Sequence, residues 1–358
     1  MVSRKEMGGN DMKGIIDRVD LDWGNLPFDF IKTDCHLEYT FADGKWDDGK
    51  VVEDDQIALH ISSTCLHYGQ EAFEGLKVFE AKDGRILCFR PDENAKRMER
   101  TARKIMMEPF PQDKFVEAVE KVARLNKRWI PPYGSGASLY VRPLLIGVSG
   151  TIGVKPSTEY KWVVFVTPVG PYFKTGLQPV NLLVEEEIDR AAPNGVGDVK
   201  VGGNYASGLR ASFAAKKKGF DEVLYLDARE KRYIDESGAT NFFGITKDGK
   251  YITPGSPTIL RSITNMSVRQ VARDLGITVE ERDVDVSELA GLAEAGCCGT
   301  AAIIAPIESI SWKGEVIRYL EPGEICGPVS KKLYDTLTGL QSGDLEDKYG
   351  WVREFNLD

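Results

Sequence analysis

The chain has 358 residues, of which 42% are hydrophobic and 28% are charged, the composition of an ordinary globular protein. A chain of this length can bury a large core and is expected to form about two domains. The 46 basic and 55 acidic residues give a net charge of −9, which argues against nucleic acid as a partner.

The sequence gives little support for secretion, for a membrane span or for a metal site. The opening residues, MVSRKEMGGNDMKG, contain no apolar core of a signal peptide, and the longest uncharged apolar run, 295–307, is too short for a bilayer span. The six cysteines show no CxxC spacing, and the three histidines form no cluster with them. We therefore expect a cytoplasmic protein with reduced cysteines, no bound metal and no membrane contact.

Three Asp-Gly pairs predict β-hairpins, because each lies between stretches rich in β-forming residues. The pairs are Asp43-Gly44, Asp83-Gly84 and Asp248-Gly249. Asp-Gly favours the left-handed dihedral angles of type I′ turns, so we expect that turn at all three positions.

Several helices are predicted from periodic apolar residues. One begins at Pro91, which suits a first helical turn, and carries an apolar stripe as far as Ile105. A second runs from about 206 to 218, with Leu209 and Phe213 on its apolar side and Gly219 as its end. Further helices are expected near 112–128, 265–275, 287–295 and 328–340.

The mixture of hairpins and helices, without a steady βαβ alternation, favours the α+β class. Between Thr167 and Pro179 the sequence concentrates proline and glycine and separates two strand-like runs. We therefore expect a small N-terminal α/β domain at 1–167, an interdomain loop at 168–178 and a large C-terminal domain at 179–358.

Glycine-rich stretches give no nucleotide-binding motif. The stretch 195–200 lacks the third glycine of GxGxxG, and no GxxxxGK[ST] occurs. Lys200, however, is followed by Gly202, Gly203 and then Tyr205. Such a lysine could lie beside a planar ligand, or it could be one more solvated lysine, and the spacing alone favours the second reading.

Two longer stretches carry a resemblance to a known family. The residues KVGGNY at 200–205 and HYGQEAFEGLK at 67–77 closely resemble those of the branched-chain amino acid aminotransferases, class IV enzymes that use pyridoxal phosphate. Further blocks follow in the family's order: FRP at 89–91, SLYVRP at 138–143, TPVGPY at 167–172, IDE at 234–236 and GTA at 299–301.

The resemblance implies a two-domain fold like that of D-amino acid aminotransferase, with pyridoxal 5′-phosphate as the cofactor. It implies a reversible ping-pong transfer of the α-amino group of L-leucine, L-isoleucine or L-valine to 2-oxoglutarate. It also implies a homodimer.

For the cofactor, the resemblance implies that Lys200 forms a Schiff base and moves a proton between the substrate Cα and the cofactor C4′. Glu236 would pair with the pyridine nitrogen, and Tyr205 would bind the phenolic oxygen. The remaining cofactor contacts would be Arg97 and the amides of Ile263, Thr264 and Thr300 at the phosphate, with Leu260 on the ring face.

For the substrate, the same resemblance implies that the amides of Thr300 and Ala301 and the hydroxyl of Tyr140 bind the α-carboxylate. Phe73 and Tyr205 would line the side-chain pocket. Tyr68 and Val154 would enter that pocket from the partner subunit, and Arg142 and Tyr172 would meet the γ-carboxylate of glutamate.

The chain departs from the family in two places. Where many members read Leu-Pro-Gly-[Ile/Val]-Thr-Arg, this chain has LRSITN at 260–265, which leaves the geometry of the phosphate loop open. A CxxC pair that some members carry is replaced by Ala302 and Ala305, and the vicinal Cys297 and Cys298 are expected to be packed in the interior.

Two other functions fit parts of the pattern. A D-amino acid or amine transaminase, or an aminodeoxychorismate lyase, would share Lys200, Arg97 and Glu236, although HYGQEAFEG, SLYVRP and TPVGPY favour the branched-chain group. A catalytically inert binding protein could keep the scaffold without forming a Schiff base.

Overall fold

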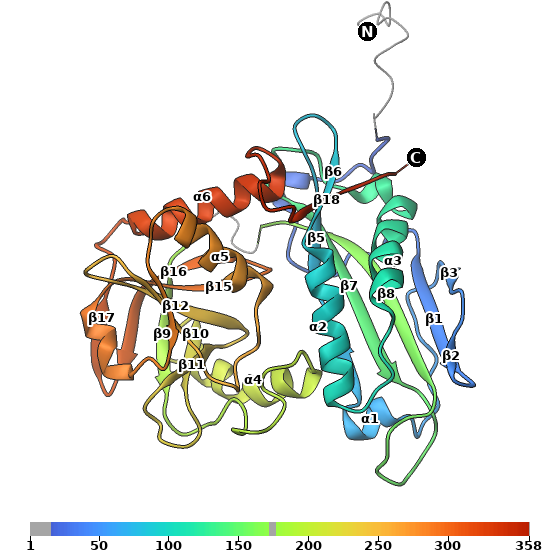
Figure 1. Ribbon diagram of the computed structural model, residues 1–358, viewed down its shortest axis with the longest axis horizontal. Helices are drawn as coiled ribbons and strands as arrows, with labels where there is room; N and C mark the ends of the chain where they lie inside the picture. Colours follow the sequence, from blue (N-terminus) through green and yellow to red (C-terminus); the bar gives the residue numbers. More distant parts are fainter. Residues whose placement is uncertain (1–15, 172–176, 358) are drawn as a thin grey trace, which may run out of the picture.

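The computed structural model describes residues 16–171 and 177–357, and its strands form two nine-stranded sheets (Figure 1). The first sheet contains β1 (His36–Ala42), β2 (Lys45–Trp46), β3 (Lys50–Val52), β4 (Glu71–Phe73), β5 (Leu76–Glu80), β6 (Ile86–Phe89), β7 (Ser138–Gly147), β8 (Tyr160–Val169) and β18 (Val352–Phe355). The second contains β9 (Val180–Glu185), β10 (Glu222–Leu226), β11 (Ile234–Ser237), β12 (Thr240–Thr246), β13 (Tyr251–Pro254), β14 (Val279–Arg282), β15 (Leu292–Gly299), β16 (Ile303–Trp312) and β17 (Glu315–Arg318).

The helices lie against these sheets (Figure 1). They are α1 (Thr64–Tyr68), α2 (Pro91–Lys104), α3 (Gln112–Leu125), α4 (Gly202–Lys217), α5 (Ile263–Asp274) and α6 (Pro328–Ser342), with 3₁₀ helices at Trp23–Asn25, Lys127–Trp129 and Val286–Gly291.

The first sheet is antiparallel, with the order β18-β6-β5-β7-β8-β1-β2. On β7, Leu139, Val141 and Leu145 pack into a core with apolar residues of α2 and α3. Because successive side chains of a strand point to opposite faces, Tyr140 and Arg142 face away from these helices. The sheet thus presents them on the face that the helices leave uncovered.

The second sheet is mixed, with the order β11-β10-β9-β16-β15-β12-β13-β14. Strand β11 pairs with both β10 and β12, so the strands from β11 around to β12 close into a ring. Apolar side chains of this ring, such as Leu182, Leu224 and Phe242, form a second core. Glu236, on β11, is held within this closed unit.

The chain changes sheets between Val169 and Val180, within the segment expected to join two domains. The last strand, β18, nevertheless returns to pair with β6 of the first sheet. The N-terminal sheet therefore takes one strand from the part of the chain assigned to the C-terminal domain. The domain boundaries at 1–167, 168–178 and 179–358 stay a prediction.

All three predicted hairpins are present, but the turn type is correct only in the first. Asp43 and Gly44 both have positive φ, 51° and 78°, and join β1 directly to β2. In the other two, only Gly84 and Gly249 are left-handed. Their loops are longer than two residues, so one left-handed residue suffices and the type I′ prediction is wrong there.

Most of the predicted helices are confirmed with shifted ends, and the one at 287–295 is wrong. The chain forms a short 3₁₀ helix at Val286–Gly291, started by a capping box at Asp285, and then enters β15. Pairing of Leu292, Glu294 and Ala295 with β12 stabilises an extended conformation there. The expected helix near 206 instead begins at Gly202.

The face of α4 was also predicted wrongly. Leu209 is 58% exposed and Phe213 is 61% exposed, whereas the small side chains Ala211 and Ala215 are buried against Val223 and Tyr225. Alanine lets the helix approach β10 closely, and the large apolar residues are left on the outer face.

Two absences can be stated for residues 16–171 and 177–357. None of the helices there combines the length and apolar character that a membrane span requires. No group of three or more His, Cys, Asp and Glu side chains in these ranges could hold a metal ion.

The packing of α4 predicts different effects for two adjacent alanines. Ala215→Leu should lower the free energy of unfolding by about 1–3 kcal/mol, because the buried site has no room for the added carbons. Ala214→Leu, on the exposed face, should change it by less than about 0.5 kcal/mol. Urea denaturation measures both, and equal effects would contradict this packing.

Candidate active site

Lys200 lies at the point where the two halves of the structure meet. Its backbone amide donates to Thr101 Oγ1 at 3.2 Å, and its carbonyl accepts from the Phe73 amide at 3.1 Å. Thr101 belongs to α2 and Phe73 to β4, so elements packed on the first sheet hold the lysine just before α4 begins. The backbone of Lys200 is therefore fixed although its loop is rich in glycine.

The side chain of Lys200 is half-buried between two aromatic rings. Its Nζ donates to the hydroxyl of Tyr205 at 2.7 Å and lies 4.6 Å from the centre of the Phe73 ring. Burial, followed by the Arg97 and Arg142 guanidiniums, lowers the pKa of Lys200 to about 7 despite the opposing carboxylates. A lysine with this pKa is largely able to lose its proton near neutral pH.

Tyr205 takes its place from the first turn of α4. Its ring lies 5.0 Å from that of Phe73, and burial together with Glu236 raises the pKa of its hydroxyl. The hydroxyl therefore stays protonated and can donate a hydrogen bond to a ligand oxygen.

Glu236 is buried on β11 and has three partners. Its Oε1 accepts from Asn241 Nδ2 at 2.7 Å and from the Leu260 amide at 2.8 Å, and its Oε2 lies 2.8 Å from Arg190 Nη1. Burial raises the pKa of Glu236 to about 7, with Arg190 opposing the shift and Asp235 adding to it. The carboxyl group is thus held in one orientation and poised to share a proton.

Arg97 is buried on α2 and makes a bidentate pair with Glu74. Its Nε and Nη2 each lie 2.7 Å from a Glu74 oxygen, and Asn94 donates to the same carboxylate at 2.8 Å. Burial acts to lower the pKa of Arg97, but the negative charge of Glu74 keeps that pKa above its ordinary value. The third nitrogen, Nη1, donates to the carbonyl of Arg261 at 3.3 Å.

That carbonyl places Arg97 beside the N-terminus of α5. The helix begins at Ile263, and Ser262 caps it by accepting from the Asn265 amide. The amides of Ile263 and Thr264 are in the first turn, where helix amides lack intrahelical acceptors and favour an anion. Arg100 is a further cationic side chain in this region. Burial and the neighbouring charges of Arg261 and Arg97 lower its pKa.

The residues that depart from the family pattern fit this loop. Ser262 serves as the N-cap, and Asn265 turns into the interior, where its side chain bonds Tyr251 at 2.8 Å and Thr253 at 3.0 Å. The helix N-terminus is therefore formed without the proline, glycine and arginine of the common pattern.

Tyr140 and Arg142 lie together on the uncovered face of β7. Arg142 Nη2 donates to the Tyr140 hydroxyl at 3.2 Å, and its guanidinium lies 5.0 Å from the centre of the Phe73 ring. Its buried Nε has no hydrogen-bond partner among the described residues. The absence of a Cβ at Gly75 leaves the space that the Tyr140 hydroxyl occupies. This group can accept an anionic ligand.

Two predicted residues, Tyr68 and Val154, are not joined to this cluster. Tyr68 donates to the carbonyl of Ile152, and Val154 is 84% exposed, so both belong to an outer apolar end formed by α1 and the loop 150–154. Tyr172 lies outside the described residues. Thr300 and Ala301 form the turn between β15 and β16.

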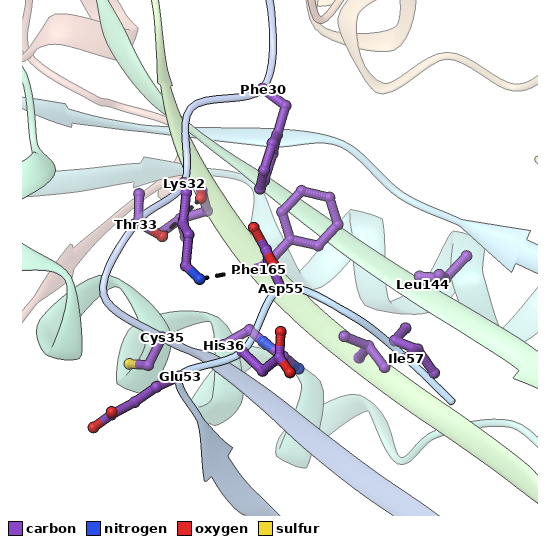
Figure 2. A pocket seen from close by; sticks show the side chains of 13 residues that line it. Phe30, Lys32, Thr33, Cys35, His36, Glu53, Asp55, Ile57, Leu144 and Phe165 are labelled. Carbon is purple, nitrogen blue, oxygen red and sulfur yellow. Dashed lines mark hydrogen bonds and ion pairs between the residues drawn. The ribbon is translucent and has the colours of Figure 1, made fainter. Parts of the chain in front are cut away.

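Of two cavities, one is lined by predicted site residues and the other is not. One of about 180 Å³ is lined by Tyr205, Glu236 and Leu260, which places these predicted contacts around a common space. Another of about 300 Å³, shown in Figure 2, has Phe30 and Phe165 in its wall and a Lys32–Asp55 ion pair of 3.7 Å at its rim. None of the predicted site residues lines the second cavity.

Sequence reasoning assigned no role to several residues of this centre. Glu74 lies within the HYGQEAFEGLK block, and Arg190 belongs to none of the motifs. Asn241 follows the IDE block and pairs with Glu236 across the hairpin of β11 and β12. The sequence offers no signal for Glu74, because its need for a cation follows from its burial, which only the structure shows.

Vicinal Cys297 and Cys298 are buried on β15, as expected. Burial raises the pKa of Cys297 to about 11, so this thiol is unreactive at neutral pH.

Known proteins resemble the chain over nearly its whole length. The family model of class IV amino-transferases matches residues 71–310. A branched-chain-amino-acid aminotransferase of Haemophilus influenzae is 49% identical over 339 residues, covering 93% of this chain and 98% of that protein. One of Helicobacter pylori is 44% identical over 337 residues, covering 94% and 98%. The chain belongs to the branched-chain-amino-acid aminotransferase family.

Solved structures of branched-chain aminotransferases share the fold. The crystal structure from Escherichia coli has a TM-score of 0.77 and 29% identity, covering 91% of this chain and 100% of that one. The T.th. structure with pyridoxamine 5′-phosphate has a TM-score of 0.76 and 27% identity over the same shares. The expected α+β class IV aminotransferase fold is confirmed.

The shifted lysine predicts a pH dependence of stability. The folded-state pKa of Lys200 is about 7 against an ordinary 10.5, so between these values the unfolded chain binds more protons and stability rises with pH. We expect the free energy of unfolding of the cofactor-free wild type to rise across this window relative to Lys200→Met.

Urea denaturation at a series of pH values measures the difference. Lys82→Met, which changes an exposed lysine, is the matched control and should follow the wild type. Parallel curves for the wild type and Lys200→Met would show that the native environment does not disfavour the ammonium.

Proposed function

We propose that this member of the branched-chain-amino-acid aminotransferase family uses pyridoxal 5′-phosphate to exchange the amino group of L-leucine, L-isoleucine or L-valine with 2-oxoglutarate. The observation that carries the proposal is the position of Lys200. Its amine, with a pKa of about 7, donates a hydrogen bond to Tyr205, and the charges of both Arg97 and Glu236 act on it.

The residues present fit this cofactor. A phosphate suits the first-turn amides of α5, because the guanidinium of Arg97 bonds the carbonyl just before that helix. A ring nitrogen suits Glu236, whose orientation is fixed by Asn241 and Arg190. The T.th. relative has been solved with pyridoxamine 5′-phosphate, which supports the same class of cofactor here.

When bound, pyridoxal phosphate supplies a carbonyl that condenses with amines and a ring that accepts electrons. Lys200 provides the nucleophilic amine and, once released, the base that takes the proton from the substrate Cα. Glu236 would hold a proton at the ring nitrogen, and Tyr205, which already contacts the lysine, would donate a hydrogen bond to the ring oxygen. Arg97 and the α5 amides keep the phosphate from moving during these transfers.

Substrate selection follows from the face of β7. The hydroxyl of Tyr140 and the amides of Thr300 and Ala301 would bind the α-carboxylate. Phe73 and Tyr205 offer an apolar wall for a branched side chain, and the Nε of Arg142, unpartnered among the described residues, favours the second carboxylate of glutamate. One site can thus accept both substrates of a ping-pong cycle.

Replacement of the lysine tests this assignment. In the wild type, L-leucine should change the visible absorbance of bound pyridoxal phosphate. In Lys200→Ala the rate of that change should fall by about 10²-fold to 10⁴-fold or more, because the base is lost. Lys82→Ala is the control and should behave as the wild type. An undiminished rate in Lys200→Ala would remove the lysine from the mechanism.

The same spectra separate the alternatives. A response to D-alanine but not to L-leucine would favour a D-amino acid transaminase. Absence of visible absorbance in the purified protein, even with added pyridoxal phosphate, would favour a binding protein.

We also propose that the functional unit is a homodimer in which Tyr68 and Val154 complete the partner's site. The support is the exposed apolar end that carries them: Ile152 is 82% exposed and Val154 84%, a cost in water that a second copy would remove.

Mixing two inactive variants tests this exchange. Lys200→Ala and Val154→Asp proteins, unfolded and refolded together, should recover about a quarter of wild-type activity, because half of the dimers are mixed and each holds one intact site. Lys200→Ala mixed with Glu236→Ala is the control and should recover none, since both residues serve their own subunit's site. Recovery in neither mixture would contradict the exchange.

A further inference from the structure

Lys77 is a buried lysine on the same face of the first sheet as Tyr140. It lies on β5, directly opposite Tyr140 of β7 in the antiparallel register, and side chains opposite each other share a face. It is only 9% exposed. It ends the HYGQEAFEGLK block, and neither the cofactor nor the substrate assignments use it.

The ammonium of Lys77 reaches across to the second sheet. Its Nζ donates to the carbonyl of Ala301 at 2.8 Å. No ion pair of this lysine occurs among residues 16–171 and 177–357, and burial alone lowers its pKa, to about 8. A buried cation satisfied by a single neutral carbonyl is costly, because the charge has lost its water without gaining an opposite charge.

Ala301 belongs to a strained turn. Gly299 of β15 pairs with Ile303 of β16, and the turn between them is formed by residues 300–302. Ile303 has a φ of 65°, a left-handed conformation that a β-branched residue rarely adopts. Such a conformation persists only where neighbouring contacts hold it. The bond from Lys77 is one such contact, and it comes from the other sheet.

The ammonium also faces open space. Lys77, Ala301, Ala302 and Ile303 line a common cavity of about 670 Å³ between the two sheets. An ammonium has three donors, and one is used on Ala301. The positive charge therefore lies beside the turn, in a cavity whose wall also holds the carboxylates of Glu80, Asp335 and Asp344.

We propose that Lys77 is a positioning residue for the substrate α-carboxylate: it fixes the Ala301 carbonyl, and with it the amides of the 299–301 turn, and places a positive charge behind them. This inference rests on the proposed function, in which these amides bind that carboxylate. It adds a charged group to a set otherwise made of neutral donors. The competing account is that Lys77 only ties the two sheets together.

The test measures binding to the holoenzyme of two ligands of the same carbon skeleton, the anionic 4-methylvaleric acid and the neutral 4-methylvaleramide. A T.th. branched-chain amino acid aminotransferase has been solved with the acid. By calorimetry, Lys77→Met should weaken the acid about tenfold and the amide less than about twofold, since only the carboxylate senses the charge. Lys77→Arg should retain the acid within about threefold.

Each other outcome is decisive. Equal weakening of both ligands in Lys77→Met would mean that the lysine only ties the two sheets together, which overturns the inference. Unchanged binding of both ligands would overturn it as well. Lys77→Gln, which keeps a donor for Ala301 without the charge, should also weaken the acid more than the amide and serves if the methionine variant does not fold. Lys82→Met should match the wild type. Failure of the wild type itself to bind the acid would overturn the proposed function as well.

Discussion

The carboxylate of Glu74 allows a guanidinium to remain charged in the interior. Glu74 is fully buried and bonds two nitrogens of Arg97 at 2.7 Å each, which offsets the loss of water around both groups. Arg97 in turn contacts the loop that starts α5 and lowers the pKa of Lys200. The anion site thus depends on one buried ion pair, whereas the lowered pKa of Lys200 comes first from burial, with Arg97 adding to the shift and Glu74 opposing it.

Local signals predicted much of the fold. The Asp-Gly pairs mark real hairpins and Pro91 begins a real helix, because turn chemistry and a proline at N1 act over a few residues. The predictions were wrong where contacts with residues far away in the sequence determine the local structure. Residues 292–295 are a strand because they pair with β12, and α4 turns its alanines inward because β10 requires close approach.

The candidate site divides in the same way. Lys200, Tyr205, Glu236 and Arg97 were named through a resemblance between motifs. The structure joins Lys200 to Tyr205 by a hydrogen bond, and the roles of all four residues stay predictions. Arg190 could not be found, because its partner on β11 is remote in the chain and no pattern surrounds it. Glu74 was quoted without a role, since its need for a cation becomes visible only when its complete burial is known.

The pairing of β18 with β6 has a consequence for biosynthesis. Translation delivers the other strands of this sheet first, but the strand that covers its β6 edge follows the whole second sheet in the chain. Until that strand has been made, the backbone donors and acceptors along the β6 edge have no permanent partner and are open to association with other nascent chains. Completion of the N-terminal sheet therefore has to wait until the second sheet has been synthesised.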